Sequence, residues 1–403
     1  MINILIIETE YEGHYLTGYI KYILRSFKNK KVGITLLTSS DAKKKAKGAF
    51  KILRKENVKF NIETVQNVKN QNCSTLRLLV NQITLYFIIK KKFKTLILLN
   101  KFDHIFLTSA QKIDKALAIF GSPFGDIVFT LIFLEVKFHL KSYGISYNSR
   151  FNYLSKKFFR KVLKIPTLHK IITNDHLLKN YTKVKKWKEH DKLKFLHDPK
   201  EFNFNFEKNS SRRILDLPKK AILILVYGAL IDSKGINELL SIFKSDKLRK
   251  DVRIILAGRH LGQVPNIFKN NIFISDLLLK KKIFIYNTWI DEKKEAHIFA
   301  ATDIVWVAYK NYSSPSGVFY QAIEKSLPVL ISNDGLINNL NKKIKVGCPV
   351  NIFNSESIIK GIDKILKKNN KKKIIKNIIK FSRISDTKKW INTFQTMHHN
   401  LYI

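Results

Sequence analysis

One short segment carries residue types that are suited to binding an anionic group. Ser316, Gly317 and Val318 open a segment whose apolar residues recur at helical spacing. Backbone N–H groups left free at a helix N-terminus attract phosphate, aided by the helix dipole. These residues are therefore candidates for binding an anionic group such as phosphate.

The elements that must position these residues alternate between strands and helices. Apolar runs predict strands at residues 2–7, 32–37, 59–65, 105–108, 168–174, 223–227, 252–260, 304–308 and 329–331. Helical spacing predicts helices between them, including residues 14–27, 42–56 and 75–98 and the segment that opens at Gly317. Such alternation indicates an α/β fold with doubly wound parallel sheets, in which ligands lie beyond the carboxyl ends of the strands.

This rule places Gly13, His14 and Tyr15, which follow the first strand, at the mouth of a site. His14 is a candidate contact to a substrate, because histidine is a frequent polar group near ligands. In the alternative interpretation, Gly13 only ends a turn and His14 only starts a helix. For residues 303–332 the corresponding alternative is a plain strand–helix–strand crossover without a ligand.

The composition sets limits on the class of protein. A chain of 403 residues with 45% hydrophobic residues predicts about two globular domains. Its formal net charge of +43 favours an anionic partner such as nucleic acid, anionic lipid or a small anionic substrate, unless it reflects a lysine-rich compositional bias. Nucleic acid is the least favoured of these partners, since neither an RNA-binding aromatic signature nor zinc-finger spacing is present.

The cysteines and the N-terminus favour the cytoplasm. Cys73 and Cys348 are far apart, which argues against a disulfide framework and suits a reducing compartment. The first residues read as a strand rather than a signal peptide, and no apolar run reaches the length of a membrane span. We therefore expect a cytoplasmic protein, with peripheral contact to the anionic inner membrane as a further possibility.

Aromatic and basic side chains are mixed over residues 121–165. The favoured interpretation is that helices pack there through core aromatics. The alternative is an acceptor-binding or lipid-facing surface, where lysines bind anionic headgroups and aromatics lie at the interface. The aromatic residues concerned are Phe124, Phe129, Phe133, Phe138, Phe151, Phe158 and Phe159.

The order of motifs over residues 196–350 resembles the retaining glycosyltransferases of family 4, also called group 1. The motifs are LHDP (196–199), GALIDSKG (228–235), AGR (257–259), AATD (300–303) and SGVFYQA followed by PV (316–329). The resemblance implies the GT-B fold, in which two Rossmann-like domains face each other across a cleft. We expect an acceptor-side domain over residues 1–190 and a nucleotide-sugar donor domain over 191–385, with a helix at 386–403 crossing back onto the first.

The same resemblance implies roles for individual residues. Lys234 falls on the lysine that contacts the donor diphosphate, together with Ser316, Gly317, Val318 and Arg259. Trp289 and Ile290 border the base, although Trp289 as core filler is an equal alternative. Lys234 and His14 are the candidate catalytic residues, and Gly13, His14 and Tyr15 form the acceptor-side loop.

The chain departs from the family pattern at three polar positions. The two family glutamates fall on Ser313 and Gln321, and the family arginine falls on Ala229. Gln321 is still able to hydrogen-bond a ribose hydroxyl, and Ser313 a sugar hydroxyl.

The resemblance predicts a metal-independent, retaining hexosyltransferase. It would move a sugar from a nucleoside diphosphate sugar to a glycan or lipid-linked acceptor of cell-surface polysaccharide type, with the donor as co-substrate and no cofactor. The alternative is a degraded homologue that acts as an adaptor on anionic membrane or nucleic acid.

Overall fold

The computed structural model describes residues 2–10, 15–68, 75–134, 136–145, 152–199, 201–269, 271–311, 313–383 and 387–399. The chain divides into two compact units. The first comprises Met1–Gly144, Asn148–Pro199 and Thr387–Ile403, and the second comprises Ile145–Tyr147 and Lys200–Asp386. The main division thus falls after Pro199, later than the boundary predicted at 190/191.

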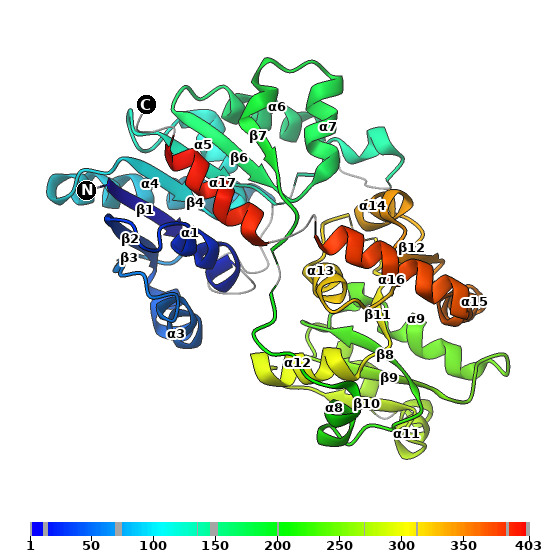
Figure 1. Cartoon of the computed structure of the whole chain (residues 1–403). Helices are drawn as coiled ribbons and strands as arrows, with labels where there is room; N and C mark the ends of the chain where they lie inside the picture. The colour runs from blue at the N-terminus through cyan, green and yellow to red at the C-terminus, as the bar shows by residue number, and fades with distance from the viewer. Residues whose placement is uncertain are drawn as a thin grey trace. The chain divides into compact units, whose positions relative to one another are not determined.

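The first unit is built on a parallel sheet that has seven strands within the described residues, in the order β3-β2-β1-β4-β5-β6-β7. Helices cover both faces of this sheet (Figure 1). The strands are β1 (Ile2–Glu8), β2 (Val32–Ser39), β3 (Asn61–Val65), β4 (His104–Leu107), β5 (Phe129–Ile132), β6 (Leu168–Thr173) and β7 (Leu193–Phe195). The helices are α1 (Ile20–Ser26), α2 (Ser40–Lys45), α3 (Lys47–Arg54), α4 (Thr75–Leu99), α5 (Asp114–Phe120), α6 (Asn152–Leu163), α7 (His176–Val184) and α17 (Thr387–His399).

Alternation along β1 divides the core of the first unit into two layers. Ile4 and Ile6 pack with α1, α3 and α17 on one face, whereas Leu5 and Ile7 pack with α4 to α7 on the other. The C-terminal helix α17 is fixed to this unit by Trp390, whose Nε1 donates to the carbonyl of His197 at 2.6 Å. The last helix therefore completes the first unit.

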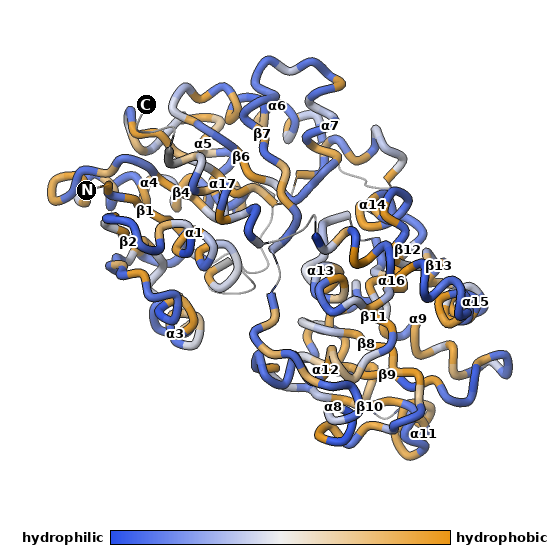
Figure 2. Tube along the Cα trace, in the orientation of Figure 1, coloured by the Kyte–Doolittle hydropathy of each residue, from blue (hydrophilic) through white to orange (hydrophobic). Residues whose placement is uncertain are grey.

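The second unit has a parallel sheet with six strands among the described residues, in the order β10-β9-β8-β11-β12-β13. The strands are β8 (Ile222–Tyr227), β9 (Val252–Ala257), β10 (Ile283–Tyr286), β11 (Ile304–Val307), β12 (Val329–Ser332) and β13 (Gly347–Val350). The helices are α8 (Lys208–Ile214), α9 (Ile236–Leu240), α10 (Val264–Phe268), α11 (Ile272–Leu279), α12 (Glu292–Ala301), α13 (Gly317–Glu324), α14 (Leu336–Ile344), α15 (Ser355–Leu366) and α16 (Lys368–Ser382). Hydrophobic residues concentrate on the strands, and the lysine-rich α16 carries hydrophilic stretches (Figure 2).

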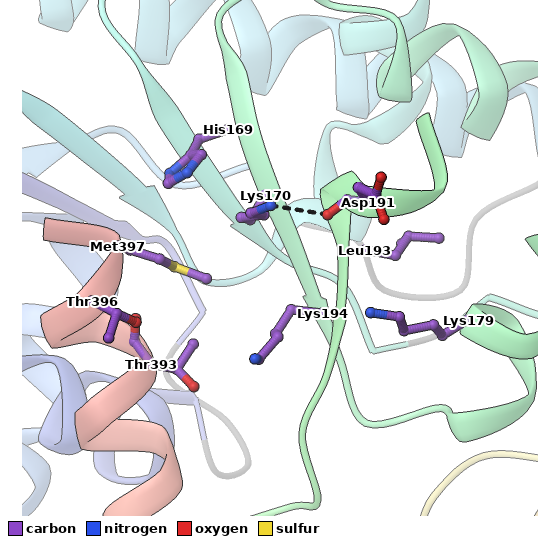
Figure 3. A pocket seen from close by; sticks show the side chains of 9 residues that line it. All are labelled: His169, Lys170, Lys179, Asp191, Leu193, Lys194, Thr393, Thr396 and Met397. Atoms are coloured by element: carbon purple, nitrogen blue, oxygen red, sulfur yellow. Dashed lines mark hydrogen bonds between the residues drawn. The ribbon is translucent and has the colours of Figure 1, made fainter. Parts of the chain in front are cut away.

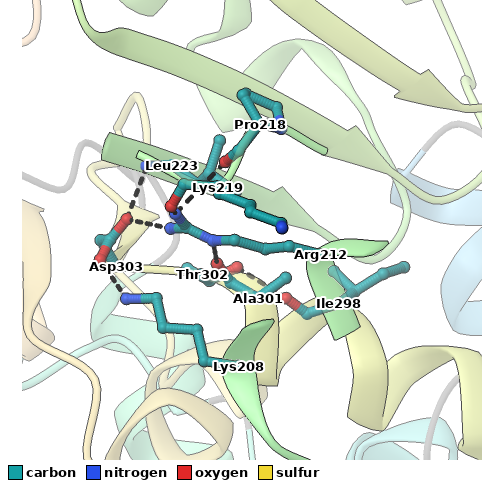
Figure 4. Close-up of polar contacts among 9 residues, drawn as sticks. All are labelled: Lys208, Arg212, Pro218, Lys219, Leu223, Ile298, Ala301, Thr302 and Asp303. Atoms are coloured by element: carbon teal, nitrogen blue, oxygen red, sulfur yellow. Dashed lines mark hydrogen bonds and ion pairs between the residues drawn. The ribbon is translucent and has the colours of Figure 1, made fainter. Parts of the chain in front are cut away.

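A buried ion pair fixes the first helix of the second unit to the start of β11 (Figure 4). The carboxylate of Asp303 accepts hydrogen bonds from Arg212 Nη2 at 2.6 Å and from the backbone N–H of Leu223 at 2.9 Å, and it pairs with Lys208. Arg212, which is 2% exposed, also donates from Nε to the carbonyl of Ala301 at 3.0 Å. Asp303, a motif position, therefore has a structural role at the amino end of its strand.

Two segments of the first unit differ from the sequence expectation. Residues 193–195, for which the sequence predicts no strand, form the edge strand β7, which pairs with β6 in parallel. Residues 129–132, predicted to be helical, form β5 because both faces of this strand are covered. The aromatic side chains around it belong to the core, as the favoured interpretation held, and Phe151 lies outside the described residues. Within the described residues, no helix combines the length and apolar content needed to span a membrane.

Candidate functional site

The position of Lys234 is set by the backbone around it. Lys234 ends a single 3-10 turn, Asp232–Lys234, and Gly235 then adopts a φ of 66°, which favours glycine. A Cβ atom on Gly235 would also lie 3.3 Å from the carbonyl oxygen of Ala308. Trp306, which is fully buried, donates from Nε1 to the carbonyl of Lys234 at 2.7 Å. The loop after β8 is thus held against the end of β11.

The ammonium of Lys234 has neutral partners. Nζ donates to the carbonyl of Tyr227 at 2.9 Å and to the hydroxyl of Tyr309 at 2.8 Å, and it lies 4.3 Å from the Tyr309 ring centroid. No acidic residue in the described part of the chain forms an ion pair with it. Although part of the residue is exposed, desolvation of the enclosed ammonium lowers the pKa of Lys234 to about 7. A bound anionic ligand would place a negative charge beside the Lys234 ammonium.

The N-terminus of α13 lies beside this ammonium. A hydrogen bond joins the side chains of Tyr309 and Ser316, and Ser316 caps α13 by accepting from the N–H of Phe319 at 3.3 Å. The N–H groups of Gly317 and Val318 belong to the first turn, where the helix offers no acceptor. A Cβ atom on Gly228 would lie 3.9 Å from both Lys234 Nζ and Val318 Cγ2, so these two groups flank the same point. The structure therefore brings four of the five diphosphate candidates together, Lys234, Ser316, Gly317 and Val318.

Two glycines let the strand ends approach one another. Gly258 has a φ of 134°, and a Cβ atom on it would lie 1.8 Å from the carbonyl oxygen of Gly228. Gly228 itself has a φ of 94°. Any larger residue at position 258 would push β9 away from β8 at the edge that carries Lys234.

Gln321 lies in a second polar cluster of the second unit. Its Nε2 donates to Glu295 Oε1 at 2.5 Å, and the hydroxyl of Tyr227 also hydrogen-bonds Glu295. Burial, together with the Glu295 charge, raises the pKa of Tyr227. The Oε1 atom of Gln321 is buried and has no hydrogen-bond partner among the described residues. Because the carbonyl of Tyr227 binds Lys234 while its hydroxyl binds Glu295, the two clusters lie at opposite ends of one residue.

Sequence reasoning missed Glu295. It lies on α12, 26 positions before Gln321, and no motif marked it. The only feature of Glu295 in the sequence is that it lies on a helix that follows a strand. Many solvent-exposed glutamates have the same position, so this feature does not mark a binding residue.

Two further donor-side candidates, Arg259 and Trp289, lie next to each other. The guanidinium of Arg259 lies 5.5 Å from the ring centroid of Trp289. Trp289 is 73% exposed, so the interpretation of Trp289 as core filler is wrong. Ile290 packs partly against the core of the second unit, and Ser313 is buried.

The acceptor-side loop is described only at its end. Gly13 and His14 lie outside the described residues, as does the side chain of Tyr15, whose backbone starts a π-helical turn, Tyr15–Tyr19. Just before this loop, the buried carboxyl group of Glu8 accepts from the hydroxyls of Thr108 at 2.5 Å and Ser109 at 2.8 Å. Burial raises the pKa of Glu8 to about 7.

A separate cavity of about 280 Å³ lies in the first unit (Figure 3). His169 and Lys170 of β6, Lys194 of β7 and Met397 of α17 line it. Lys170 donates to the carbonyl of Asp191 at 2.9 Å. The cavity contains none of the residues that the motifs single out.

Residues 207–381 match the family model described as "Glycosyl transferases group 1". This match lies within the second unit, Lys200–Asp386. No curated protein matches the chain. The group 1 match contains both polar clusters described above, and it ends before α17.

Solved structures of glycosyltransferases resemble the whole chain. HepE from Anabaena, in complex with UDP and glucose, has a TM-score of 0.71 at 15% identity, covering 99% of this chain and 100% of that one. A glycosyltransferase from Rickettsia africae has a TM-score of 0.64 at 17% identity, covering 100% and 98%. Sucrose-phosphate synthase from Thermosynechococcus elongatus has a TM-score of 0.71 at 12% identity, covering 100% and 99%. The chain thus has the GT-B fold, as predicted.

Proposed function

We propose that this chain transfers a sugar from a nucleoside diphosphate sugar to a hydroxyl acceptor, with the donor bound by the second unit. The observation that carries the proposal is the hydrogen-bonded path from Lys234 Nζ through the Tyr309 hydroxyl to Ser316. It joins a cation that has no acidic partner among the described residues to the open N-terminus of α13. The UDP bound in HepE from Anabaena favours the same class of ligand.

This arrangement suits the departure of a diphosphate. When the bond between the anomeric carbon and the phosphate oxygen breaks, negative charge grows on that oxygen. The ammonium of Lys234 and the N–H groups of Gly317 and Val318 would stabilise this charge, with no metal required. In the retaining mechanism that the group suggests, the acceptor oxygen attacks the same face, and its proton passes to the departing phosphate.

The second cluster would bind the ribose. Its carboxylate is Glu295 rather than a residue of the α13 motif, and Gln321 contributes the buried acceptor Oε1. A ribose diol offers two hydroxyl donors, which these two acceptors would satisfy. Trp289, whose ring is exposed beside Arg259, would cover the base.

The identity of the acceptor is the finer part of the proposal. We assign Gly13, His14 and Tyr15 to the acceptor side, and a glycan or lipid-linked hydroxyl to the acceptor, as in polysaccharide assembly. Lys234 and His14 would then be the residues nearest to the chemistry.

A panel of nucleoside diphosphate sugars tests the function. We expect one donor to be hydrolysed slowly, or transferred to an added glycan, with release of the nucleoside diphosphate. Glu295→Gln should weaken binding of that donor about tenfold, or 1.4 kcal/mol, because a charged acceptor becomes a neutral amide. Glu292→Gln, on the same helix and bonded to Asn203, is the matched control and should have no effect.

Three results would count against parts of this proposal. Tight binding without turnover of any donor would identify a degraded homologue. Absence of both binding and turnover across the panel would reject the donor site. Equal losses from Glu295→Gln and Glu292→Gln would remove Glu295 from the ribose contacts.

A further inference from the structure

The helix α4 carries apolar side chains on two opposite faces. One face packs into the core through Leu85, Ile89, Phe93 and Leu96, at helical spacing. The other face is exposed and carries four large apolar residues, with exposed fractions of 73% for Leu76, 52% for Val80, 46% for Phe87 and 82% for Leu98. A surface helix of a globular protein normally carries polar residues on its outer face.

The exposed face continues onto the neighbouring helix α5. The rings of Phe87 and Phe120 lie 5.2 Å apart, and Ile119 and Phe120 are 46% and 44% exposed. Single exposed apolar residues are common, whereas a row of them along a helix and its neighbour marks an interaction site.

The charged side chains of α4 are all basic. Residues 75–99 contain Arg77 and four lysines and no acidic residue. Lys91 and Lys94 lie on the exposed face, and no ion pair engages either of them in the described part of the chain. Lys92, at the side of the helix, pairs with Glu63 at 2.7 Å. Ammonium groups among exposed apolar side chains are complementary to a layered surface that has an apolar interior and anionic groups at its outer boundary.

We propose that α4 docks the first unit onto an anionic phospholipid surface. Leu76, Val80, Phe87 and Leu98 enter the headgroup and acyl-chain boundary, while Lys91 and Lys94 bind lipid phosphates. The aromatic residues at 121–165, which were the lipid-facing candidates from sequence, are largely buried, so the surface lies on α4 instead. This proposal does not depend on the donor site.

Flotation of the full chain with lipid vesicles tests the apolar part. Binding is expected to phosphatidylcholine vesicles that contain phosphatidylglycerol. Phe87→Ser combined with Leu98→Ser should weaken this binding at least tenfold. Leu76→Ser with Leu98→Ser is a second variant at more exposed positions, should the first fold poorly. The matched control is Ile272→Ser with Leu279→Ser on α11, where the side chains are 87% and 84% exposed; it should bind as the unmodified chain does.

A charge exchange tests the electrostatic part. Lys91→Glu with Lys94→Glu should abolish the preference for phosphatidylglycerol, whereas Lys372→Glu with Lys373→Glu, exposed on α16, should leave most of it. Equal losses from the two pairs would show that the net charge of +43 alone attracts lipid and would overturn the proposal. Failure to bind either kind of vesicle would also overturn it. Self-association that is lost with Phe87→Ser and Leu98→Ser would assign the face to a second copy instead.

Discussion

The most direct test of the donor site is how its affinity depends on pH. Desolvation lowers the pKa of Lys234 to about 7, from an ordinary value of 10.5, and an anion binds only to the charged form. Below about pH 7 the ammonium is charged and affinity for a nucleoside diphosphate sugar should be constant. Above it, each pH unit removes about nine-tenths of the charged form, so affinity should fall up to tenfold per unit, or about 1.4 kcal/mol.

The choice of ligand removes a competing titration. Both phosphates of a nucleoside diphosphate sugar are esterified, so its charge is constant over this range, whereas a free diphosphate gains charge near neutral pH. Isothermal titration calorimetry at several values between about pH 6 and about pH 9 would give the slope. Lys234→Met should bind more weakly at low pH and show no slope. Lys247→Met, which removes an exposed lysine paired with Glu356, is the control.

The same pKa makes a prediction about the unliganded fold. Between about pH 7 and 10.5 the unfolded chain binds a proton at Lys234 that the folded chain does not bind, so this residue makes stability rise with pH. Lys234→Met should remove that rise of stability with pH.

The affinity measurements decide the assignment of Lys234 to the diphosphate. A donor affinity that is constant between about pH 6 and about pH 9, or the same slope of affinity with pH in Lys234→Met, would refute it.

Two substitutions test the elements that position the site. Arg212→Met leaves the carboxylate of Asp303 without its buried partner and should lower the free energy of unfolding by about 3–5 kcal/mol. The control Arg249→Met, at an exposed ion pair, should change this free energy by less than about 1 kcal/mol. Similar values for the two variants in urea denaturation would contradict the structural role of Arg212. Gly258→Ala should destabilise the chain and remove donor binding, because its Cβ would lie 1.8 Å from a backbone oxygen, while Gly48→Ala, where the space is open, should be neutral or stabilising by up to about 1 kcal/mol. An intact, donor-binding Gly258→Ala protein would contradict the close approach of the strands.

The alternation of elements was predictable because each sheet is buried on both faces. Such strands are continuous apolar runs, and β1, β2, β8, β9 and β11 were found from that signal. The edge strand β7 was missed because it has three residues, of which the middle one is an exposed lysine. Short edge strands carry charge to prevent pairing with other chains, and this removes the apolar signal.

The two halves of the candidate diphosphate site could be proposed from the sequence because each half is local in the chain. One half is the adjacent pair Lys234 and Gly235, and the other is the adjacent pair Ser316 and Gly317. In each pair the local backbone geometry limits which residue types fit. Their proximity to each other needed the structure, since it depends on the parallel pairing of β8 with β11. Neither Tyr309, which joins them, nor Glu8 at the end of β1 belongs to a recognisable spacing.

One departure from the group pattern, Gln321, has a physical explanation only in three dimensions. Read position by position, Gln321 is a lost carboxylate, and this favours a degraded protein. In the structure, the amide of Gln321 instead donates to Glu295, which places an acid beside the motif position. Had a glutamate stood at position 321, two carboxylates would lie within hydrogen-bonding distance, and their repulsion would raise the pKa of one of them. The amide therefore fits a site in which the acid comes from α12, and the loss of one motif acid is weak evidence for loss of activity.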